Sequence, residues 1–370
     1  MTADAAQRSA QQQAELAVGV SDPNPRVGCV LVADALGVIG EGHTQAAGLA
    51  HAEVMALRAA HEAGQDVRGA TAYVSLEPCS HDGRTPPCCE ALIAAGIAKV
   101  VVALIDPNPQ VAGRGIARLR AAGIEVEVVG GQWAAASREL NIGFFSRMVR
   151  GRPWLRMKVA ASLDGRTALD SGASQWITGQ AARADGHAWR RRAGAVLTGI
   201  GTVREDDPRL DVRRVPTLQQ PLRVVVDSRL DIDARARLLQ PPGQALIYTA
   251  SDDALRIAAL AAPQVEVARL PANTQGKTEL AAMLADLARR EINELHVEAG
   301  EKLNGSLLRE GLVDELLLYV APRLLGPGRS MAAIGPLASL AESLDFEFVE
   351  VERVGADLRL RLRPPGRELF

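Results

Sequence analysis

A chain of 370 residues is long enough for two hydrophobic cores. Its hydrophobic fraction of 47% and charged fraction of 23% are typical of a globular protein, and its net charge of −2 gives no field that would attract nucleic acid or an anionic membrane. The polar N-terminus (residues 1–16) is not a signal peptide, and the longest apolar run (residues 91–105) is too short to span a bilayer, so we expect a cytoplasmic protein.

The first 130 residues alternate between helix-like and strand-like segments. Apolar residues at helical spacing predict helices, and short β-branched runs predict strands. The expected helices are residues 5–18, 51–63, 88–95 and 114–122, and the expected strands are residues 27–32, 37–42, 70–76, 100–105 and 124–129. Such alternation predicts an α/β fold with a mixed or parallel sheet between helices.

Three candidate metal ligands lie at or near the expected starts of two of these helices. His51 offers an imidazole, while Cys79 and Cys88, each preceded by proline, offer thiolates. Three such ligands leave a tetrahedral zinc one open position for water. Glu53 would then lie beside that water and move protons, as in the H-x-E…P-C…C pattern of zinc nucleobase deaminases. The competing interpretation is a helix-start His and Glu with unrelated cysteines.

Longer strings around these residues carry a resemblance. They are Pro23-Asn24-Pro25-x-Val27-Gly28, Gly42-His43-x4-Gly48-x2-His51-Ala52-Glu53, and Glu77-Pro78-Cys79-Ser80-His81-x-Gly83-Arg84-Thr85-Pro86-Pro87-Cys88. The first half resembles the cytidine-deaminase-like superfamily and, within it, the pyrimidine deaminase of riboflavin biosynthesis. Eight residues separate Cys79 from Cys88, where the generic signature has two. This longer spacing argues against a cytidine or tRNA-adenosine editor.

The resemblance implies roles for single residues. It makes His51, Cys79 and Cys88 the zinc ligands and Glu53 the catalytic residue, with Cys89 as the alternative third ligand. It assigns Asn24, His43 and His81 to the substrate pocket, where a purely structural role is the alternative for each. Cys29 is expected in the core and His61 on the surface.

The pattern changes near residue 150. A short expected helix at 140–148 precedes the basic joint Arg150-Gly151-Arg152-Pro153, which predicts a boundary between domains 1–149 and 150–370. Beyond it, the expected helices are residues 181–191, 277–290 and 303–310. The expected strands are residues 154–160, 195–198, 223–227, 245–249, 265–269, 295–298, 315–320 and an antiparallel hairpin of 346–354 with 357–362.

A dinucleotide-binding glycine motif is not found in this half, because Gly199-Ile200-Gly201 continues to Arg204 where a third glycine is needed. Other strings are present: Met157-Lys158-x-Ala160-x-Ser162-Leu163-Asp164-Gly165, Ser174-x-Trp176-Ile177-Thr178, Gly201-Thr202-Val203-x2-Asp206-Asp207-Pro208-x-Leu210, Val225-Val226-Asp227-Ser228 and Val297-Glu298-Ala299-Gly300. They resemble the riboflavin-pathway reductase, which has the dihydrofolate-reductase-like fold.

This second resemblance implies an NADPH site and a substrate site. The cofactor residues would be Ala160, Trp176, Thr202, Asp206, Ser228 and the turn Gly300, Glu301, Lys302, Leu303, Asn304 and Gly305. The substrate residues would be Ser174, Arg190, Leu210, Arg213 and Glu298, and Lys158 joins Arg190 and Arg213 as a candidate phosphate ligand. A solvated surface is the alternative for each lone arginine, and the core is the alternative for Trp176.

Two local features bear on the nucleotide. Gly300 and Gly305 are expected to flank a strand-to-helix turn whose N–H groups can meet a pyrophosphate. Ser228 and Arg229 follow a strand and suit a 2′-phosphate, whereas the neighbouring Asp227 would suit a plain ribose. We favour Ser228 and Arg229, which predicts NADPH.

The combined prediction is a bifunctional enzyme of riboflavin synthesis, with an N-terminal cytidine-deaminase-like α/β/α domain and a C-terminal dihydrofolate-reductase-like domain. We expect zinc-dependent deamination of 2,5-diamino-6-ribosylamino-4(3H)-pyrimidinone 5′-phosphate, followed by NADPH-dependent reduction to 5-amino-6-(5-phosphoribitylamino)uracil. One rival is a zinc deaminase with a non-catalytic second domain. Another is a nucleic-acid editor, against which the near-neutral charge argues. We expect a homo-oligomer with no nucleic-acid or membrane partner.

Overall fold

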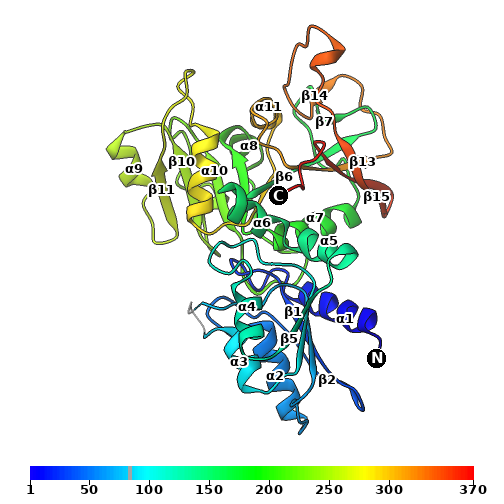
Figure 1. The fold of residues 1–370 in the computed structure, drawn as a ribbon. Coiled ribbons are helices and arrows are strands. Elements are labelled where there is room, and N and C mark those ends of the chain that lie inside the picture. The colour runs from blue at the N-terminus through cyan, green and yellow to red at the C-terminus, as the bar shows by residue number, and fades with distance from the viewer. Residues whose placement is uncertain (82–85) are drawn as a thin grey trace. The chain divides into compact units, whose positions relative to one another are not determined.

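A computed structural model describes residues 1–81 and 86–370. The chain divides into two compact units, residues 1–151 with Phe370 and residues 152–369, and Figure 1 shows the elements of each. The part of the expected deaminase string that contains Gly83, Arg84 and Thr85 lies outside the described residues. Among the helices of the described chain, none has the length and apolar character needed to cross a membrane.

Within its described residues, the first unit has a five-stranded sheet in the order β2-β1-β3-β4-β5. Strand β1 pairs antiparallel with β2 and β3, and β3, β4 and β5 run parallel. The strands are β1 (Gly28–Ala33), β2 (Gly37–His43), β3 (Thr71–Val74), β4 (Lys99–Val102) and β5 (Glu125–Val128). The helices are α1 (Ala3–Leu16), α2 (Ala52–Glu62), α3 (Cys88–Ala94), α4 (Arg114–Ala121), α5 (Gly131–Leu140) and α6 (Ile142–Arg150).

Helices cover both faces of this sheet. Along β1, Val30 and Val32 pack with α1 on one face, whereas Cys29 and Leu31 join the core formed with α2, α3 and α4 on the other. Successive strand residues point to opposite faces, so a fully apolar strand serves both layers. The result is the α/β/α arrangement expected from the sequence.

Two glycines of β2 let α2 lie unusually close to the sheet. A Cβ at Gly40 would lie 2.3 Å from the carbonyl oxygen of Ala56, and a Cβ at Gly42 would lie 2.5 Å from the Ala56 nitrogen. Only glycine fits such an approach of helix backbone to strand. The start of α2, with His51 and Glu53, is therefore held directly against the end of β2.

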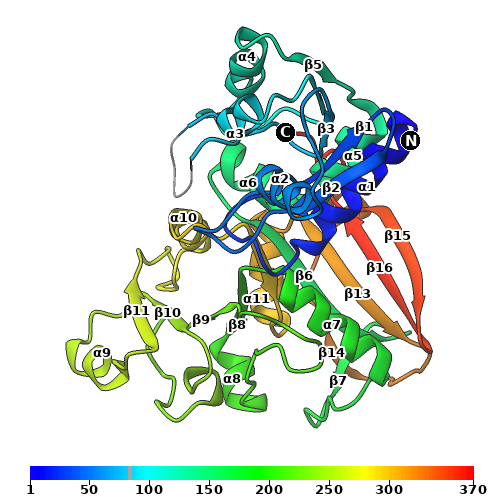
Figure 2. The same ribbon diagram turned by 90° about the horizontal axis from the view of Figure 1, so that it is seen from below.

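All of residues 152–369 are described, and they form a nine-stranded sheet in the order β11-β10-β9-β8-β12-β6-β13-β16-β15, which Figure 2 follows from β11 at one edge to β15 at the other. The first seven strands in this order are parallel, and β16 and β15 are antiparallel to their neighbours. The strands are β6 (Trp154–Ser162), β8 (Ala195–Gly199), β9 (Leu222–Val226), β10 (Ala245–Thr249), β11 (Val265–Arg269), β12 (Glu294–Val297), β13 (Glu315–Ala321), β15 (Glu347–Val354) and β16 (Asp357–Arg363). A separate pair joins β7 (Arg166–Leu169) to β14 (Gly328–Ser330).

The two faces of this larger sheet differ in character. One is apolar and packs against α10 (Leu280–Arg289) and α11 (Glu301–Arg309). The other is covered by α7 (Gln180–Arg192), α8 (Ile200–Asp206) and α9 (Ala254–Leu260). Beneath α7 this second face carries charged groups: buried Arg156 of β6 contacts Glu294 at 2.6 Å and Glu315 at 2.5 Å. Buried charges of this kind persist where they are paired.

Candidate active sites

Two helix starts bring the candidate zinc ligands together in the first unit. His51 is the N-cap residue of α2, and Cys88 is the first residue of α3. Cys79 lies in the segment between β3 and α3. Among the described residues, these three offer ligand atoms that lie within 4.8 Å of one another.

The spacing of the three ligand atoms fits a tetrahedral zinc ion. The Nδ1 atom of His51 lies 3.6 Å from the Sγ atom of Cys79 and 3.4 Å from that of Cys88. Zinc bonds of about 2.3 Å to sulfur and about 2.0 Å to nitrogen put the two ligand atoms about 3.5 Å apart at a tetrahedral angle. The donor set and its geometry therefore suit zinc, with Nδ1 as the ligand nitrogen.

Cys89 faces a different environment from Cys88. Its Sγ lies 3.4 Å from the carbonyl oxygen of Pro78 and 3.6 Å from that of Gly115, and its thiol is fully buried. Burial raises the pKa of the Cys89 thiol, which disfavours a thiolate there. The geometry thus brings Cys88, and not Cys89, next to His51 and Cys79.

The thiols of Cys79 and Cys88 differ in pKa. Hydrogen bonding from Cys88, with a further contribution from His51, lowers the pKa of Cys79 to about 4. The pKa of Cys88 is raised, because its proton is held by the bond to Cys79 and the thiol is buried. The surroundings thus favour the thiolate at Cys79 over that at Cys88, and metal binding displaces protons from thiol ligands.

Glu53 lies in the first turn of α2 and is 3% exposed. Burial raises the pKa of its carboxyl group, and the negative charge of Cys79 raises it further. Glu53 is not a member of the ligand group. A carboxyl group with a raised pKa beside a metal site is suited to taking up and releasing a proton.

Glu77 holds the loop that carries Cys79. Its buried carboxylate accepts hydrogen bonds from the backbone nitrogens of Asp106 at 3.2 Å, Gly113 at 2.9 Å and Ile116 at 3.1 Å. In the sequence Glu77 stands out only as part of the Glu77-Pro78-Cys79 string, which does not predict this role. Its partners lie more than 28 residues further along the chain, so no local signal identifies them.

The expected pyrimidine-pocket residues lie in a turn, at the end of β2 and in the segment before α3 of the first unit. Asn24 is half-buried in a turn where its nitrogen donates to Ser21 at 2.8 Å. His43 ends β2 and is half-buried, and burial lowers the pKa of its ring. His81 has a buried Nδ1 with no partner in the described part of the chain. Their roles in binding stay predictions.

In the second unit, Glu298 is the centre of a cluster of charged residues just past the end of β12. Arg190 of α7 binds its carboxylate with two nitrogens, one of them at 3.0 Å, and Lys158 of β6 lies 3.7 Å away. Burial opposes ionisation of Glu298, but the charges of Arg190 and Lys158 outweigh it and hold the pKa of this carboxyl well below its usual range. The side chain of Glu298 is still 17% exposed, so a ligand can reach it.

The loop after α8 carries Leu210 and Arg213, two of the other expected substrate residues. Arg190 also donates to the carbonyl oxygen of Asp211 at 2.8 Å, and Asp211 accepts from Arg213 at 2.5 Å. Leu210 is only 2% exposed and has a φ of 55°, so its side chain packs inside the protein. Ser174 is half-buried between β7 and α7.

Two helices begin at the carboxyl ends of neighbouring parallel strands, β8 and β12. Gly300 is the N-cap of α11, and its backbone nitrogen donates to the hydroxyl of Thr202 on α8 at 3.1 Å. N–H groups at such ends suit a pyrophosphate. Trp176 is 56% exposed, with the Arg183 guanidinium 4.6 Å from its ring centre, so the core alternative for this tryptophan is wrong.

The remaining expected cofactor residues differ in how accessible they are. Glu301 and Leu303 are half-buried, Lys302 and Asp206 are exposed, and Ala160 is half-buried on the same face of β6 as Lys158. Gly305 was expected to flank the turn, but it lies inside α11, where a Cβ would meet the Ala333 oxygen at 2.2 Å. Asn304 is buried and donates to Ala299 at 3.1 Å and Met331 at 2.9 Å. Both residues fix α11 against the 331–333 segment.

The residues expected to distinguish the nucleotide lie just beyond β9, which ends at Val226 and not at Asp227. The hydroxyl of Ser228 accepts from the Thr278 nitrogen at 2.9 Å. Asp227 is 1% exposed and accepts from the Ile232 nitrogen at 2.7 Å, so its carboxylate shapes the turn instead of facing a ribose. Arg229 is exposed.

Comparison with known proteins identifies the family. Residues 2–104 match the family described as the cytidine and deoxycytidylate deaminase zinc-binding region, and residues 153–360 match the RibD C-terminal domain. The riboflavin biosynthesis protein RibD of Escherichia coli is 45% identical over 353 residues, which cover 92% of this chain and 93% of that protein. The chain belongs to the RibD family.

Further RibD relatives agree over nearly the whole length. RibD of Aquifex aeolicus is 41% identical, with 92% of each chain covered. A structure of Acinetobacter baumannii RibD matches with a TM-score of 0.87 at 43% identity, covering 97% of this chain and 98% of that one. A Thermotoga maritima diaminohydroxyphosphoribosylaminopyrimidine deaminase/5-amino-6-(5-phosphoribosylamino)uracil reductase matches with a TM-score of 0.87 at 32% identity, covering 98% of each chain.

As a member of the RibD family, the chain is a bifunctional enzyme of riboflavin biosynthesis, a hydrolase and an oxidoreductase. Its N-terminal part is a cytidine-deaminase-like zinc domain, and its C-terminal part is a dihydrofolate-reductase-like domain that uses NADPH. The predictions of fold class, family, activity and cofactors are confirmed.

Proposed function

We propose that residues 1–149 deaminate 2,5-diamino-6-ribosylamino-4(3H)-pyrimidinone 5′-phosphate and that residues 150–370 then reduce the ribosyl chain to give 5-amino-6-(5-phosphoribitylamino)uracil. The observation that carries this proposal is that each compact unit holds one complete cluster, His51, Cys79 and Cys88 with Glu53 in the first, and Glu298, Lys158 and Arg190 in the second. The activities in the name of the Thermotoga maritima relative support the same order of reactions.

In the deaminase half, His51, Cys79 and Cys88 would hold zinc, which supplies a water of lowered pKa when bound. Glu53 takes the proton from that water and delivers it to the departing amino group. Water adds to the ring carbon, ammonia leaves, and a carbonyl group replaces the amine. Asn24 and His43 hold the pyrimidine, since their half-buried positions leave polar groups within reach of a ligand.

In the reductase half, the Gly300 turn and the exposed Trp176 hold NADPH, which supplies a hydride when bound. Lys158 and Arg190 attract the substrate's phosphate, and Arg213 adds a third positive charge from the neighbouring loop. Glu298 accepts a hydrogen bond from a ribosyl hydroxyl. Its depressed pKa keeps it an acceptor throughout the working pH range.

The choice of NADPH over NADH falls to Arg229. This residue is exposed beside the carboxyl end of β9, where a guanidinium suits a 2′-phosphate. Ser228 contributes by holding Thr278, and its hydroxyl can still donate one hydrogen bond. Asp227, which would favour a plain ribose, is 1% exposed, and one of its oxygens accepts from the Ile232 nitrogen.

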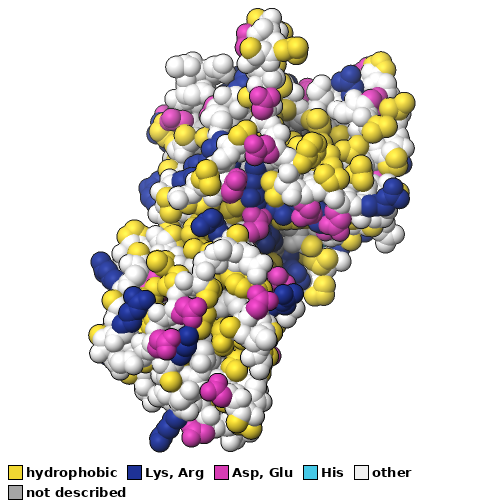
Figure 3. Space-filling view, turned by 45° about the vertical axis from the view of Figure 1, so that its right-hand side comes forward, with side chains coloured by type: hydrophobic (Ala, Val, Ile, Leu, Met, Phe, Trp, Pro, Cys, Tyr) yellow, Lys and Arg dark blue, Asp and Glu magenta, His cyan; other side chains and the backbone are white. Residues whose placement is uncertain are grey.

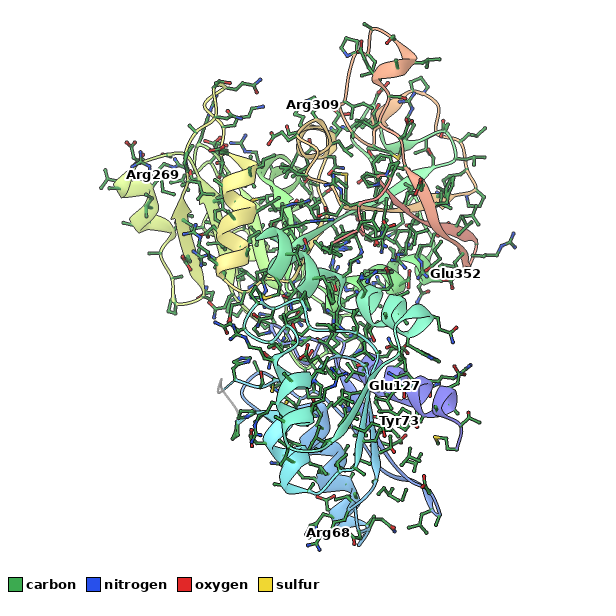
Figure 4. The ribbon with its side chains drawn as sticks, in the orientation of Figure 1. Arg68, Tyr73, Glu127, Arg269, Arg309 and Glu352 are labelled. Carbon is green, nitrogen blue, oxygen red and sulfur yellow. The ribbon has the colours of Figure 1, made fainter. Side chains whose placement is uncertain are left out.

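We further propose a cytoplasmic homo-oligomer with a small phosphorylated pyrimidine as its substrate and no nucleic-acid or membrane partner. Edge strand β15 supports the oligomer, because Phe348 is 65% exposed and Val351 60% exposed beside Glu352 (Figure 4). Unpaired apolar edges of this kind favour association. In Figure 3, which turns this side of the second unit forward, hydrophobic side chains gather beside acidic and basic ones. Four free cysteines suit a reducing compartment.

The test supplies the purified, zinc-loaded chain with the proposed pyrimidine and NADPH. We expect ammonia release first and stoichiometric NADPH oxidation afterwards, with NADPH oxidation alone when the deaminated compound is supplied. Ammonia release without NADPH oxidation would favour the rival with a non-catalytic second domain. Light scattering in the same buffer measures the oligomeric state, and a monomeric mass would contradict the homo-oligomer.

A further inference from the structure

The second unit contains a buried histidine directly behind the exposed carboxylate of its cluster. His296, on β12, is 0% exposed, and its Nε2 atom lies 3.4 Å from an oxygen of Glu298. His296 pairs in register with Arg156 of β6, so both side chains lie on the charged face beneath α7. Glu298, two residues further along, is on the same face and is 17% exposed.

The imidazole of His296 is polar, and its near neighbour, the Glu298 oxygen at 3.4 Å, is too far away and too poorly aligned for a normal hydrogen bond. In the described part of the chain, neither Nδ1 nor Nε2 has a hydrogen bond of good geometry. Leaving a buried polar group unpaired costs about 1–3 kcal/mol, so an unpaired imidazole at this position calls for an explanation. An unpaired buried imidazole aimed at a ligand-accessible carboxylate points to a role in function.

Arg190 determines what that role is. Its guanidinium grips Glu298 with two nitrogens and donates to Asp211 with the third. This two-pronged arrangement is the one that binds carboxylate or phosphate, and it holds one oxyanion at a time. A phosphorylated substrate that takes this side of Arg190 must therefore displace Glu298, which would keep only Lys158, at 3.7 Å.

We propose that His296 is a positioning residue that donates its Nε2–H to the oxygen of Glu298 that Arg190 releases when substrate binds. The gap of 3.4 Å needs to close by only a few tenths of an ångström to become a normal hydrogen bond. Burial lowers the pKa of His296, so the ring is neutral and can carry its single proton on Nε2. The inference rests on the proposed reductase substrate, and it makes His296 the residue that keeps Glu298 aimed at the ribosyl hydroxyl.

The test uses His296→Leu, which removes the donor, and His296→Gln, whose amide nitrogen can occupy the Nε2 position. Tyr248→Phe serves as a matched control, because Tyr248 is equally buried and packs on the opposite face of the sheet, where its hydroxyl donates to Asp286 at 2.7 Å. Steady-state kinetics on the deaminated substrate, NADPH affinity by fluorescence and thermal unfolding are measured for full-length, zinc-loaded protein.

We expect His296→Leu to raise the KM for the deaminated substrate at least tenfold with NADPH affinity unchanged, and His296→Gln to return it to within threefold of the parent. Tyr248→Phe should lower the Tm without changing KM. An unchanged KM in His296→Leu, or an equal rise in both His296 variants, would overturn the inference while leaving the proposed function standing. A parent enzyme that does not oxidise NADPH with this substrate would overturn both.

Discussion

Cys88 and Cys89 are adjacent in the chain, yet their thiols meet different surroundings. Cys88 lies 3.4 Å from His51, whereas Cys89 faces carbonyl oxygens. We therefore expect Cys88→Ala to lose stoichiometric zinc and Cys89→Ala to retain it, as measured by metal analysis of the purified proteins. Zinc retained in Cys88→Ala and lost in Cys89→Ala would move the third ligand to Cys89.

Glu53 allows the proton carrier to be separated from the ligands. Because it lies outside the ligand group, Glu53→Gln should keep zinc at the parent level. The amide cannot carry the proton, so ammonia release should fall by a factor of about 10²–10⁴. Metal analysis and an ammonia assay on the same preparation test both statements, and loss of zinc would show that Glu53 supports the metal.

His187 links the stability of the second unit to pH. Burial, with the charges of Arg190 and Arg213, lowers the pKa of its ring from 6.5 to about 4. The folded protein thus prefers the neutral ring, and this contribution to the free energy of unfolding is complete above pH 6.5 and lost as the pH falls towards 4. The loss amounts to roughly 3 kcal/mol at most.

His187→Asn should remove this pH dependence, because an amide does not titrate in this range. The amide oxygen can also replace the Nδ1 acceptor that receives the Arg213 backbone nitrogen at 3.3 Å, so the local structure is kept. Urea unfolding at several pH values between 4 and 7, followed by tryptophan fluorescence, reports mainly on this unit, since Trp154, Trp176 and Trp189 all belong to it. The same pH slope in parent and variant would contradict the prediction.

At the scale of elements, the contact of β2 with α2 sets the position of the zinc ligands. A Cβ at Gly42 would lie 2.5 Å from the helix backbone, so Gly42→Ala should push α2 away from the sheet. We expect weaker zinc binding and a loss of about 1–3 kcal/mol in the free energy of unfolding, typical of overpacking. Zinc titration and thermal unfolding measure the two effects.

Gly37→Asn, at the other end of β2, is the matched control. Gly37 has a φ of +78° and open space around it, and asparagine tolerates that conformation. This variant should bind zinc like the parent. Equal zinc loss in both variants would mean that β2 as a whole, and not its close approach to α2, supports the site.

Strands with a run of apolar or alternating residues were predictable from the sequence, whereas the short helix α8 was not. Strands β10 and β11 match the expected ranges, and the hairpin of β15 and β16 matches within one residue. Helix α8 was missed, because its seven residues include glycine and threonine and their pattern is no different from a loop. The helix expected at 277–290 begins only at Leu280, since Thr278 is held by Ser228.

Residues 131–150 show how tertiary contacts divide a helix. One short helix was expected at 140–148, whereas α5 and α6 meet at Asn141. The side chain of Asn141 accepts from the Arg26 nitrogen at 2.7 Å and donates to the Arg26 oxygen at 2.9 Å. A partner 115 residues away fixes this break, so the local sequence could not reveal it.

Some residues of the candidate sites could be predicted from the local sequence, and others could not. His51, Glu53, Cys79 and Cys88 were found because each type of residue has a specific chemistry and a fixed neighbourhood in the chain. Glu77 and His296 were missed because their importance comes from strands and loops that meet only in the fold. The substrate and cofactor residues taken from the resemblance stay predictions until a bound ligand is observed.

For the whole molecule, two compact units with separate cores predict separable activities. Chelation of zinc from the full chain should abolish ammonia release and leave NADPH oxidation on the deaminated substrate within about twofold, because none of the groups around Glu298 is a zinc ligand. Ammonia and absorbance assays on one chelated sample measure both. Parallel loss of the two activities would show that the reductase needs the metalated deaminase half.

The turn after β12 fixes the separation between Glu298 and Gly300. Glu298, the proposed substrate ligand, and Gly300, in the turn proposed to meet the pyrophosphate, are two residues apart, so at most about 7 Å of backbone joins them. In the proposed complex, one short segment of backbone therefore positions both the sugar and the nicotinamide nucleotide. On the proposed assignment, one residue inserted between these two positions is expected to change the distance between substrate and nicotinamide.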